Sequence, residues 1–116
     1  METTTELFVE PSALIVDVGD DMLALCHEFL PPGGLTVYRV AHAHAACERI
    51  GVLLPRLVVV PAAMHSADLD MIEDRAAAVG AVVLHLDRDH DYQLICAQLD
   101  LTVQDLRAQY GSSRSS

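Results

Sequence analysis

Basic side chains are scarce in this sequence. Its 116 residues include seven lysines and arginines against seventeen aspartates and glutamates, which gives a formal net charge of −10. A chain with this charge repels the phosphate backbone of nucleic acids, which argues against a basic face that binds duplex DNA. A basic protein partner or a divalent cation would instead be attracted to it.

Long apolar runs are also missing. No run approaches the roughly 20 residues that a membrane-spanning helix needs, and residues 1–6 are polar and acidic, unlike a signal peptide. We therefore expect a soluble, cytoplasmic protein. Hydrophobic residues make up 52% of the chain, which is enough for one buried core. We predict a single domain over residues 7–110 and a flexible tail over residues 111–116.

Cysteine pairs with the spacing of redox or zinc motifs are absent. The three cysteines, Cys26, Cys47 and Cys96, each lie in an apolar helical pattern, so we interpret them as buried, reduced thiols. His44 and Cys47 would share a helix face at a spacing of three residues. A zinc site needs three or four converging ligands, so packing is the better interpretation for this pair. No metal or other cofactor is expected.

What the sequence does contain is a strand pattern followed by a helix pattern, four times over. Apolar or alternating runs rich in β-branched residues predict strands at residues 13–18, 35–40, 57–60 and 81–86. Apolar side chains three and four residues apart predict a helix after Asp20 or Asp21 as N-cap, a second over residues 43–50 with Gly51 as C-cap, and a third over residues 68–79 after Ser66. Helical crossovers between strands indicate a parallel sheet.

The last quarter of the chain is less regular. Asp89 could cap a helix that carries Tyr92, Ile95, Cys96 and Leu99 on one face. Residues 102–105 have the form of a capping box and would start a second short helix, with Leu106 and Tyr110 as its apolar contacts. A different interpretation makes residues 93–96 a fifth strand, although the spacing of the apolar residues favours helix.

The carboxyl ends of parallel strands share one edge of a sheet, and ligands of such sheets bind there. The residues expected at this edge are Asp17, Asp20, Asp21, His42, Pro61, His65, Asp87 and Asp89. The first three aspartates could hold a hard cation such as Mg²⁺, or they could be acids attracted to the positive end of a helix dipole. The polar run over residues 85–91 is open to two similar interpretations, a ligand site or a solvated loop.

One known family has a similar layout. The strand over residues 13–16 ends in Asp17, the strand over residues 57–60 ends in Pro61, and 44 residues separate the two. This pattern resembles a response-regulator receiver domain, which implies an α/β, three-layer, flavodoxin-like parallel sheet whose fifth strand is uncertain or missing here. In that family the first strand ends in an acidic pair that holds Mg²⁺, and the third ends in the aspartate that accepts phosphate.

The positions that carry receiver chemistry are changed in this sequence. Asp17 matches the first acid of the pair, but Val18 replaces the second, Pro61 replaces the phosphate acceptor and Leu86 replaces the switch threonine or serine. No lysine follows Asp91. Proline has no nucleophile, so phosphoryl transfer at that position is chemically impossible. The resemblance implies a non-enzymatic pseudo-receiver that works by protein–protein interaction in bacterial signal transduction or cell organisation, independently of phosphorylation. Its partner would be another signalling protein or a second copy of the chain.

Two rival functions use the acidic edge instead. Residues 82–89 resemble the DxD strand of Toprim phosphotransfer domains, which would make the chain a metal-dependent enzyme. Such domains also need a glutamate where this sequence has Asp17 or Val18. The second rival is a small-molecule sensor. Both would draw on the same candidate ligand residues, namely Asp17, Asp20, Asp21, His65, Asp87 and Asp89.

Overall fold

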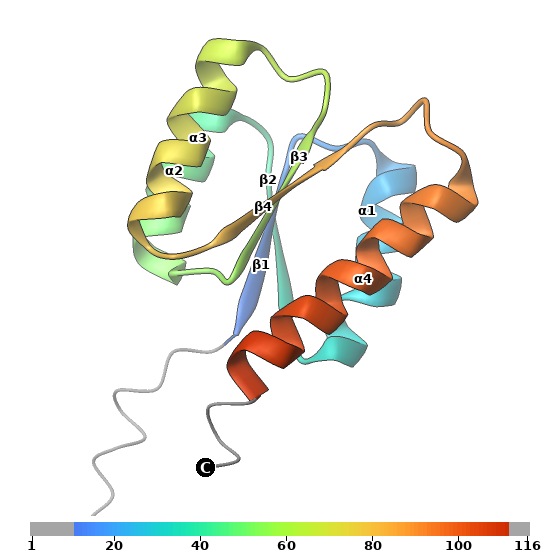
Figure 1. Cartoon of the computed structure of the whole chain (residues 1–116). Coiled ribbons are helices and arrows are strands. Elements are labelled where there is room, and N and C mark those ends of the chain that lie inside the picture. The colour runs from blue at the N-terminus through green and yellow to red at the C-terminus, as the bar shows by residue number, and fades with distance from the viewer. Residues whose placement is uncertain (1–10, 112–116) are drawn as a thin grey trace, which may run out of the picture.

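A computed structural model describes residues 11–111 of the chain, and within them the strands form one parallel sheet (Figure 1). The sheet has four strands in the order β2-β1-β3-β4, which is compatible with a flavodoxin-like fold. The strand bounds are β1 (Ser12–Val16), β2 (Thr36–Val40), β3 (Leu57–Pro61) and β4 (Val82–Leu86). The four strands expected from the sequence are therefore confirmed, and so are the parallel pairings between them.

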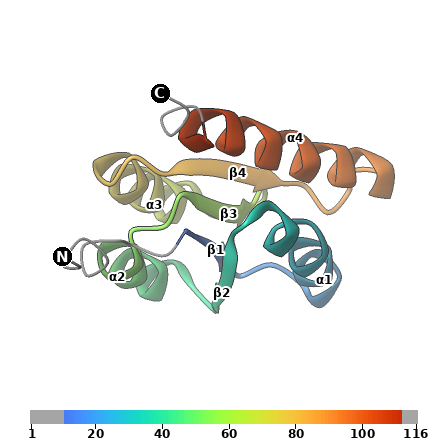
Figure 2. The same ribbon diagram turned by 90° about the horizontal axis from the view of Figure 1, so that it is seen from below.

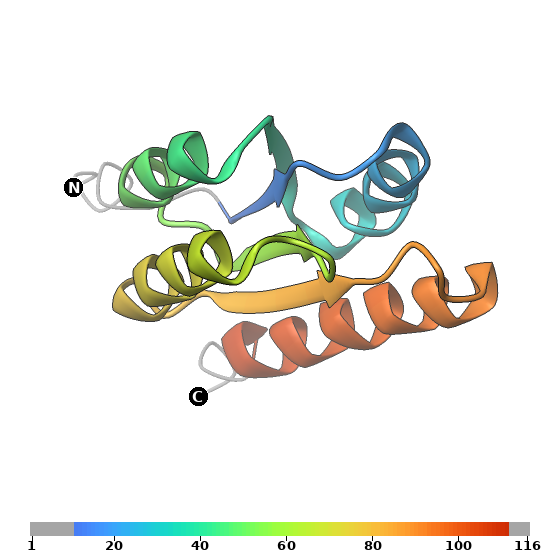
Figure 3. The same ribbon diagram turned by 90° about the horizontal axis from the view of Figure 1, so that it is seen from above.

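Helices lie on both sides of this sheet (Figures 2 and 3). Their bounds are α1 (Asp20–Phe29), the short 3-10 helix η2 (Pro31–Gly33), α2 (Ala43–Leu53), α3 (Ser66–Ala78) and α4 (Tyr92–Gly111). Helices α1 and α4 contribute to one apolar cluster, and α2 and α3 contribute to a second. No helix among the described residues combines the length and the apolar character that crossing a membrane would require.

Apart from Ser12 at the start of β1, the central strands β1 and β3 are apolar, because both of their faces are covered. Ala13 and Ile15 of β1 pack in the cluster with α1 and α4, whereas Leu14 and Val16 pack in the cluster with α2 and α3. All four side chains are fully buried. Strand side chains alternate between the two faces of a sheet, so a continuous apolar run, rather than an alternating one, predicts a strand between two layers of helices.

The first strand ends two residues earlier than the sequence predicted. Asp17 has φ of 49°, a left-handed conformation that aspartate tolerates better than most residues and that ends the extended backbone. Its N–H still donates to the carbonyl oxygen of Val40 at 2.9 Å. Gly19 then serves as the N-cap of α1 without a side-chain hydrogen bond, so the prediction that Asp20 or Asp21 caps this helix was wrong.

The next two helices are capped by histidines. The Nδ1 atom of His42 accepts a hydrogen bond from the Ala45 N–H at 3.3 Å, and that of His65 accepts one from the Ala67 N–H at 3.2 Å. Helix α3 therefore begins at Ser66, so Ser66 is not its cap. Helix α2 also runs past Gly51, the expected C-cap, and ends at Leu53; its C-cap is Leu54, which adopts the left-handed conformation.

The C-terminal part differs most from expectation, because residues 92–111 form one continuous helix. Thr102, expected to begin a second helix, donates from Oγ1 to the Gln98 carbonyl oxygen at 2.7 Å, a bond that a threonine makes inside a helix. The predicted break was therefore wrong. Residues 93–96 are helical, so the alternative fifth strand is also wrong, and the described sheet ends at β4.

The physical reason is that one apolar face continues across the predicted break. Its members, buried at intervals of three and four residues, are Ile95, Leu99, Val103 and Leu106. They pack in the cluster that also contains Leu25 and Cys26 of α1, and this burial holds the whole helix against α1. Of the expected domain and tail, residues 7–10 and 112–116 lie outside the described part of the chain, and Gly111 is the last residue of α4.

Candidate functional site

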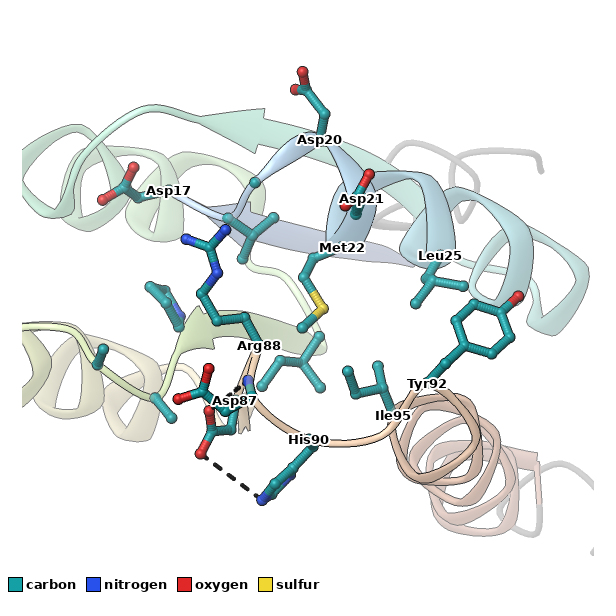
Figure 4. Close-up of a pocket in the computed structure, with 17 residues that line it drawn as sticks. Asp17, Asp20, Asp21, Met22, Leu25, Asp87, Arg88, His90, Tyr92 and Ile95 are labelled. Carbon is teal, nitrogen blue, oxygen red and sulfur yellow. Dashed lines mark hydrogen bonds and ion pairs between the residues drawn. The ribbon is translucent and has the colours of Figure 1, made fainter.

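A pocket of about 470 Å³ opens at the carboxyl edge of the sheet, between the ends of β1, β3 and β4 and the first turns of α1 and α4 (Figure 4). Its lining comprises Asp17, Val18, Gly19, Asp20, Asp21, Met22, Leu25, Pro61, Ala62, Ala63, Leu86, Asp87, Arg88, Asp89, His90, Tyr92 and Ile95. The sequence placed six of these residues at the edge, namely Asp17, Asp20, Asp21, Pro61, Asp87 and Asp89.

The floor of the pocket is apolar. Val18 is only 8% exposed and Leu86 only 2% exposed, and both belong to the apolar cluster beneath α1 and α4. Met22 and Ile95 extend this surface from the two helices, and Figure 4 shows their side chains turned toward each other. The ends of β1 and β4 thus present buried hydrocarbon to the pocket.

Pro61 is the last residue of β3, and it pairs in register with Leu86 at the end of β4. The ladder between β1 and β3 reaches only as far as Ile15 with Val59. Pro61 therefore lies beyond that ladder, where its missing N–H interrupts no pairing with β1. This placement lets a proline stand at the mouth of the pocket without a cost to the sheet.

The aspartates on the β1 side point apart. Asp17, Asp20 and Asp21 are exposed, and Figure 4 shows the carboxylates of Asp17 and Asp20 turned away from each other. Asp20 lies 4.0 Å from the guanidinium of Arg39 and is 95% exposed, so this ion pair contributes little to stability. Asp20 and Asp21 occupy the first turn of α1, where the helix dipole favours negative charge.

The loop after β4 is held by Asp87. Its Oδ1 accepts a hydrogen bond from the Asp89 N–H at 2.9 Å, and its backbone oxygen accepts one from the His90 N–H at 3.0 Å. The His90 Nε2 lies 3.8 Å from Oδ2 of the same aspartate. This turn presents Arg88, whose side chain extends across the pocket toward the β1 side in Figure 4.

As they stand, these carboxylates do not form a metal site. Within residues 11–111, no three histidine, cysteine, aspartate or glutamate side chains gather closely enough to hold an ion. His65 and His42, which the sequence placed at this edge, do not line the pocket. Their Nδ1 atoms cap α3 and α2 instead.

Sequence reasoning missed the wall that α4 supplies, Tyr92 and Ile95, and the cation Arg88. The hydroxyl pKa of Tyr92 is raised, mainly by the charge of the neighbouring Cys96 and by a hydrogen bond with it. Arg88 could have been recognised as the one basic residue in an acidic loop that follows a strand. The contribution of α4 to the pocket could not have been recognised from the sequence, because it depends on which face of the sheet the helix covers.

The cysteines lie away from the pocket lining. Burial raises the pKa of the Cys26 thiol to about 11 and also raises that of Cys47. A raised pKa keeps a thiol protonated and unreactive near neutral pH. All three cysteines are free, and the prediction that Cys26 and Cys47 are buried, reduced thiols is confirmed, whereas Cys96 is only partly buried.

Comparison with known proteins does not assign this chain to a family. A scan of the sequence against models of protein families found no matching family, and a search of curated proteins found no match. Any assignment of function therefore rests on the residues and on the geometry described above.

Proposed function

We propose that this protein is a pseudo-receiver, a three-layer, flavodoxin-like domain that binds another protein in bacterial signal transduction or cell organisation without catalysis and without phosphorylation. One observation carries the proposal. Val18, Pro61 and Leu86 line a single pocket at the strand ends, and none of their side chains carries a nucleophile, a carboxylate or a hydroxyl group. These are the three positions on which phosphoryl transfer would depend in the family that the sequence resembles.

The burial of two of these residues supports the same proposal. Val18 and Leu86 are part of the apolar core, and a carboxylate placed among such side chains would lose its hydration without gaining a partner. The pocket floor therefore opposes the binding of Mg²⁺ and phosphate. A domain without that chemistry has no phosphorylated state to switch to, so a partner, rather than a phosphate, would set its activity.

The charge of the pocket indicates what kind of partner fits. Five aspartates line it against one arginine, Arg88, and the rim lies above an apolar floor. A lysine or arginine side chain of a partner could place its charged end among the carboxylates and its apolar stem against Met22 and Ile95. We infer that the partner surface is basic, in keeping with the net charge of −10.

A small-molecule sensor is the second candidate, and the pocket volume of about 470 Å³ favours it. Sites for small ligands are usually concave, mostly apolar and about 300–1,000 Å³ in volume, with a few polar groups that orient the ligand. The same pocket would then hold an organic cation rather than a side chain of a partner.

The first experiment tests for residual receiver chemistry. Mg²⁺, Mn²⁺ and beryllofluoride are titrated against the protein while its thermal unfolding is followed. A specific site would stabilise the fold by about 2.7 kcal/mol at a hundredfold excess over its dissociation constant, and we expect no measurable shift. Incubation with acetyl phosphate should leave the intact mass unchanged for the wild type and also for Pro61→Asp, because Val18 and Leu86 remain. A phosphorylated Pro61→Asp protein would overturn the proposal.

The second experiment tests the pocket as a contact surface. Proteins captured from the native organism by the wild type are compared with those captured by Asp17→Asn/Asp87→Asn, which removes two charges at the rim. Asp70→Asn/Asp74→Asn removes two exposed charges from α3 and serves as the matched control. We expect a partner that the pocket variant loses and the control retains. Equal capture by all three proteins would contradict the proposal.

A further inference from the structure

Helix α4 carries apolar side chains on the side that faces away from its own core. The exposed apolar positions are Leu94, Ala97, Leu101 and Ala108, and the two leucines are 46% and 59% exposed. At 100° per residue these four side chains fall within one stripe, roughly opposite the buried face of Ile95 and Leu99. Figures 2 and 3 show α4 along the outside of the molecule, beyond β4.

The spacing of this stripe is that of a helix-pairing seam. Leu94, Leu101 and Ala108 recur every seven residues, and Ala97 and Gln104 fall three residues after the first two. These are the a and d positions of a heptad pattern. The seam extends over about 21 Å of helix. Its alanines are small enough to let two helix backbones approach closely.

The charges beside the seam indicate which helix fits it. In heptad terms Asp100 and Arg107 are g positions, and Asp105 is an e position. All three are exposed, and no described residue forms an ion pair with Arg107. In an antiparallel pair of two copies, g positions face g positions, so Asp100 of each copy meets Arg107 of the other. In a parallel pair, g faces e, so Asp100 would meet Asp105 twice, and like charges would repel.

We propose that α4 pairs with the α4 of a second copy of this chain in an antiparallel, two-fold symmetric dimer. The same surface meets itself under a two-fold axis. The register that sets Asp100 against Arg107 also sets Ala97 of each copy against Ala108 of the other, and Leu101 against Gln104, whose amide donates to Asp100 within its own helix at 2.9 Å. A single helix pair buries less surface than a standard stable interface of roughly 1,200–2,000 Å², so the dimer should be weak and depend on protein concentration. This inference goes beyond the proposed function and uses none of the pocket residues.

The test measures molar mass by sedimentation of the full chain from micromolar to near-millimolar concentration, at physiological ionic strength. We expect a reversible monomer–dimer equilibrium. Leu101→Glu, which puts two carboxylates into the centre of the seam, should weaken the dimer by roughly tenfold or more. Val52→Glu is the matched control. Val52 lies on α2 and is 76% exposed, so this substitution should leave the dimer unchanged. Circular dichroism confirms that both variants are folded.

Charge exchange distinguishes the two orientations. Asp100→Arg alone and Arg107→Asp alone should each weaken the antiparallel dimer, and the double exchange should restore it. A protein that stays monomeric at every concentration would overturn the proposal. So would a dimer that survives Leu101→Glu, or one that Asp100→Arg strengthens, because that result requires parallel helices. Loss of partner capture by the pocket variant bears on the proposed function alone.

Discussion

Gly33 provides a direct test of how α4 packs on η2. This glycine ends η2, and a Cβ atom placed on it would overlap Cγ1 of Val103 in α4. Val103 is 7% exposed, and as a β-branched residue within a helix it has little freedom to change rotamer. Gly33→Ala therefore forces η2 and α4 apart or strains the valine.

The size of the effect follows from overpacking, which costs about 1–3 kcal/mol when one methyl group is forced into a filled space. For a domain of this length, roughly 4 °C of melting temperature is lost per kcal/mol. Val103→Ala alone removes two buried methyl groups and should cost about 2 kcal/mol. In the double variant the new methyl group occupies the space that Val103 has vacated, so it should be no less stable than Val103→Ala alone.

The assay is urea unfolding followed by circular dichroism, analysed as a thermodynamic cycle. Gly51→Ala is the matched control, because Gly51 lies within α2 and a Cβ there would have nothing within 4 Å. That substitution should stabilise the protein by about 0.5–1 kcal/mol. If Gly33→Ala behaves like Gly51→Ala, or if the effects of Gly33→Ala and Val103→Ala simply add, α4 does not pack on η2 and the reasoning fails.

Three further predictions concern backbone conformation and thiol chemistry. Leu54 holds φ of 49° at the end of α2 and is 44% exposed, so Leu54→Gly should raise the free energy of unfolding by about 0.5–1 kcal/mol, whereas Leu54→Ala should not. In the native state an alkylating reagent should modify the partly exposed Cys96 faster than the buried Cys26 and Cys47, and unfolding should abolish the difference. Because burial raises the pKa of Cys26 from 9.0 to about 11, the folded thiol keeps its proton where the unfolded thiol has lost it. The free energy of unfolding should therefore fall as pH rises from 9 toward 11, and a flat profile there would contradict the assignment.

The candidate site was only partly accessible from the sequence. Asp17, Pro61 and Asp87 could be placed at one edge because parallel strands end at the same side of a sheet, and the strand ends are marked by local residue patterns. The sequence could not exclude His65 from the candidate site. A histidine that follows a strand has the same local sequence pattern whether its side chain faces a pocket or caps a helix. The hydrogen bond from Ala67 N–H to its Nδ1 atom, at 3.2 Å, distinguishes the two.

The sequence by itself determined the order of strands and helices through β4. The spacing of hydrophobic residues and the residues that end helices are local signals, which involve only a few neighbouring positions. It also determined that Pro61 can accept no phosphate, since that is a property of the proline side chain. Only the tertiary structure decided that residues 92–111 are one helix, that this helix lies beside α1, and that Val18 and Leu86 form an apolar pocket floor. Those outcomes depend on the burial of Ile95, Leu99 and Val103 against side chains far away in the chain, and the free energy of such contacts overrides the local capping signal at Thr102.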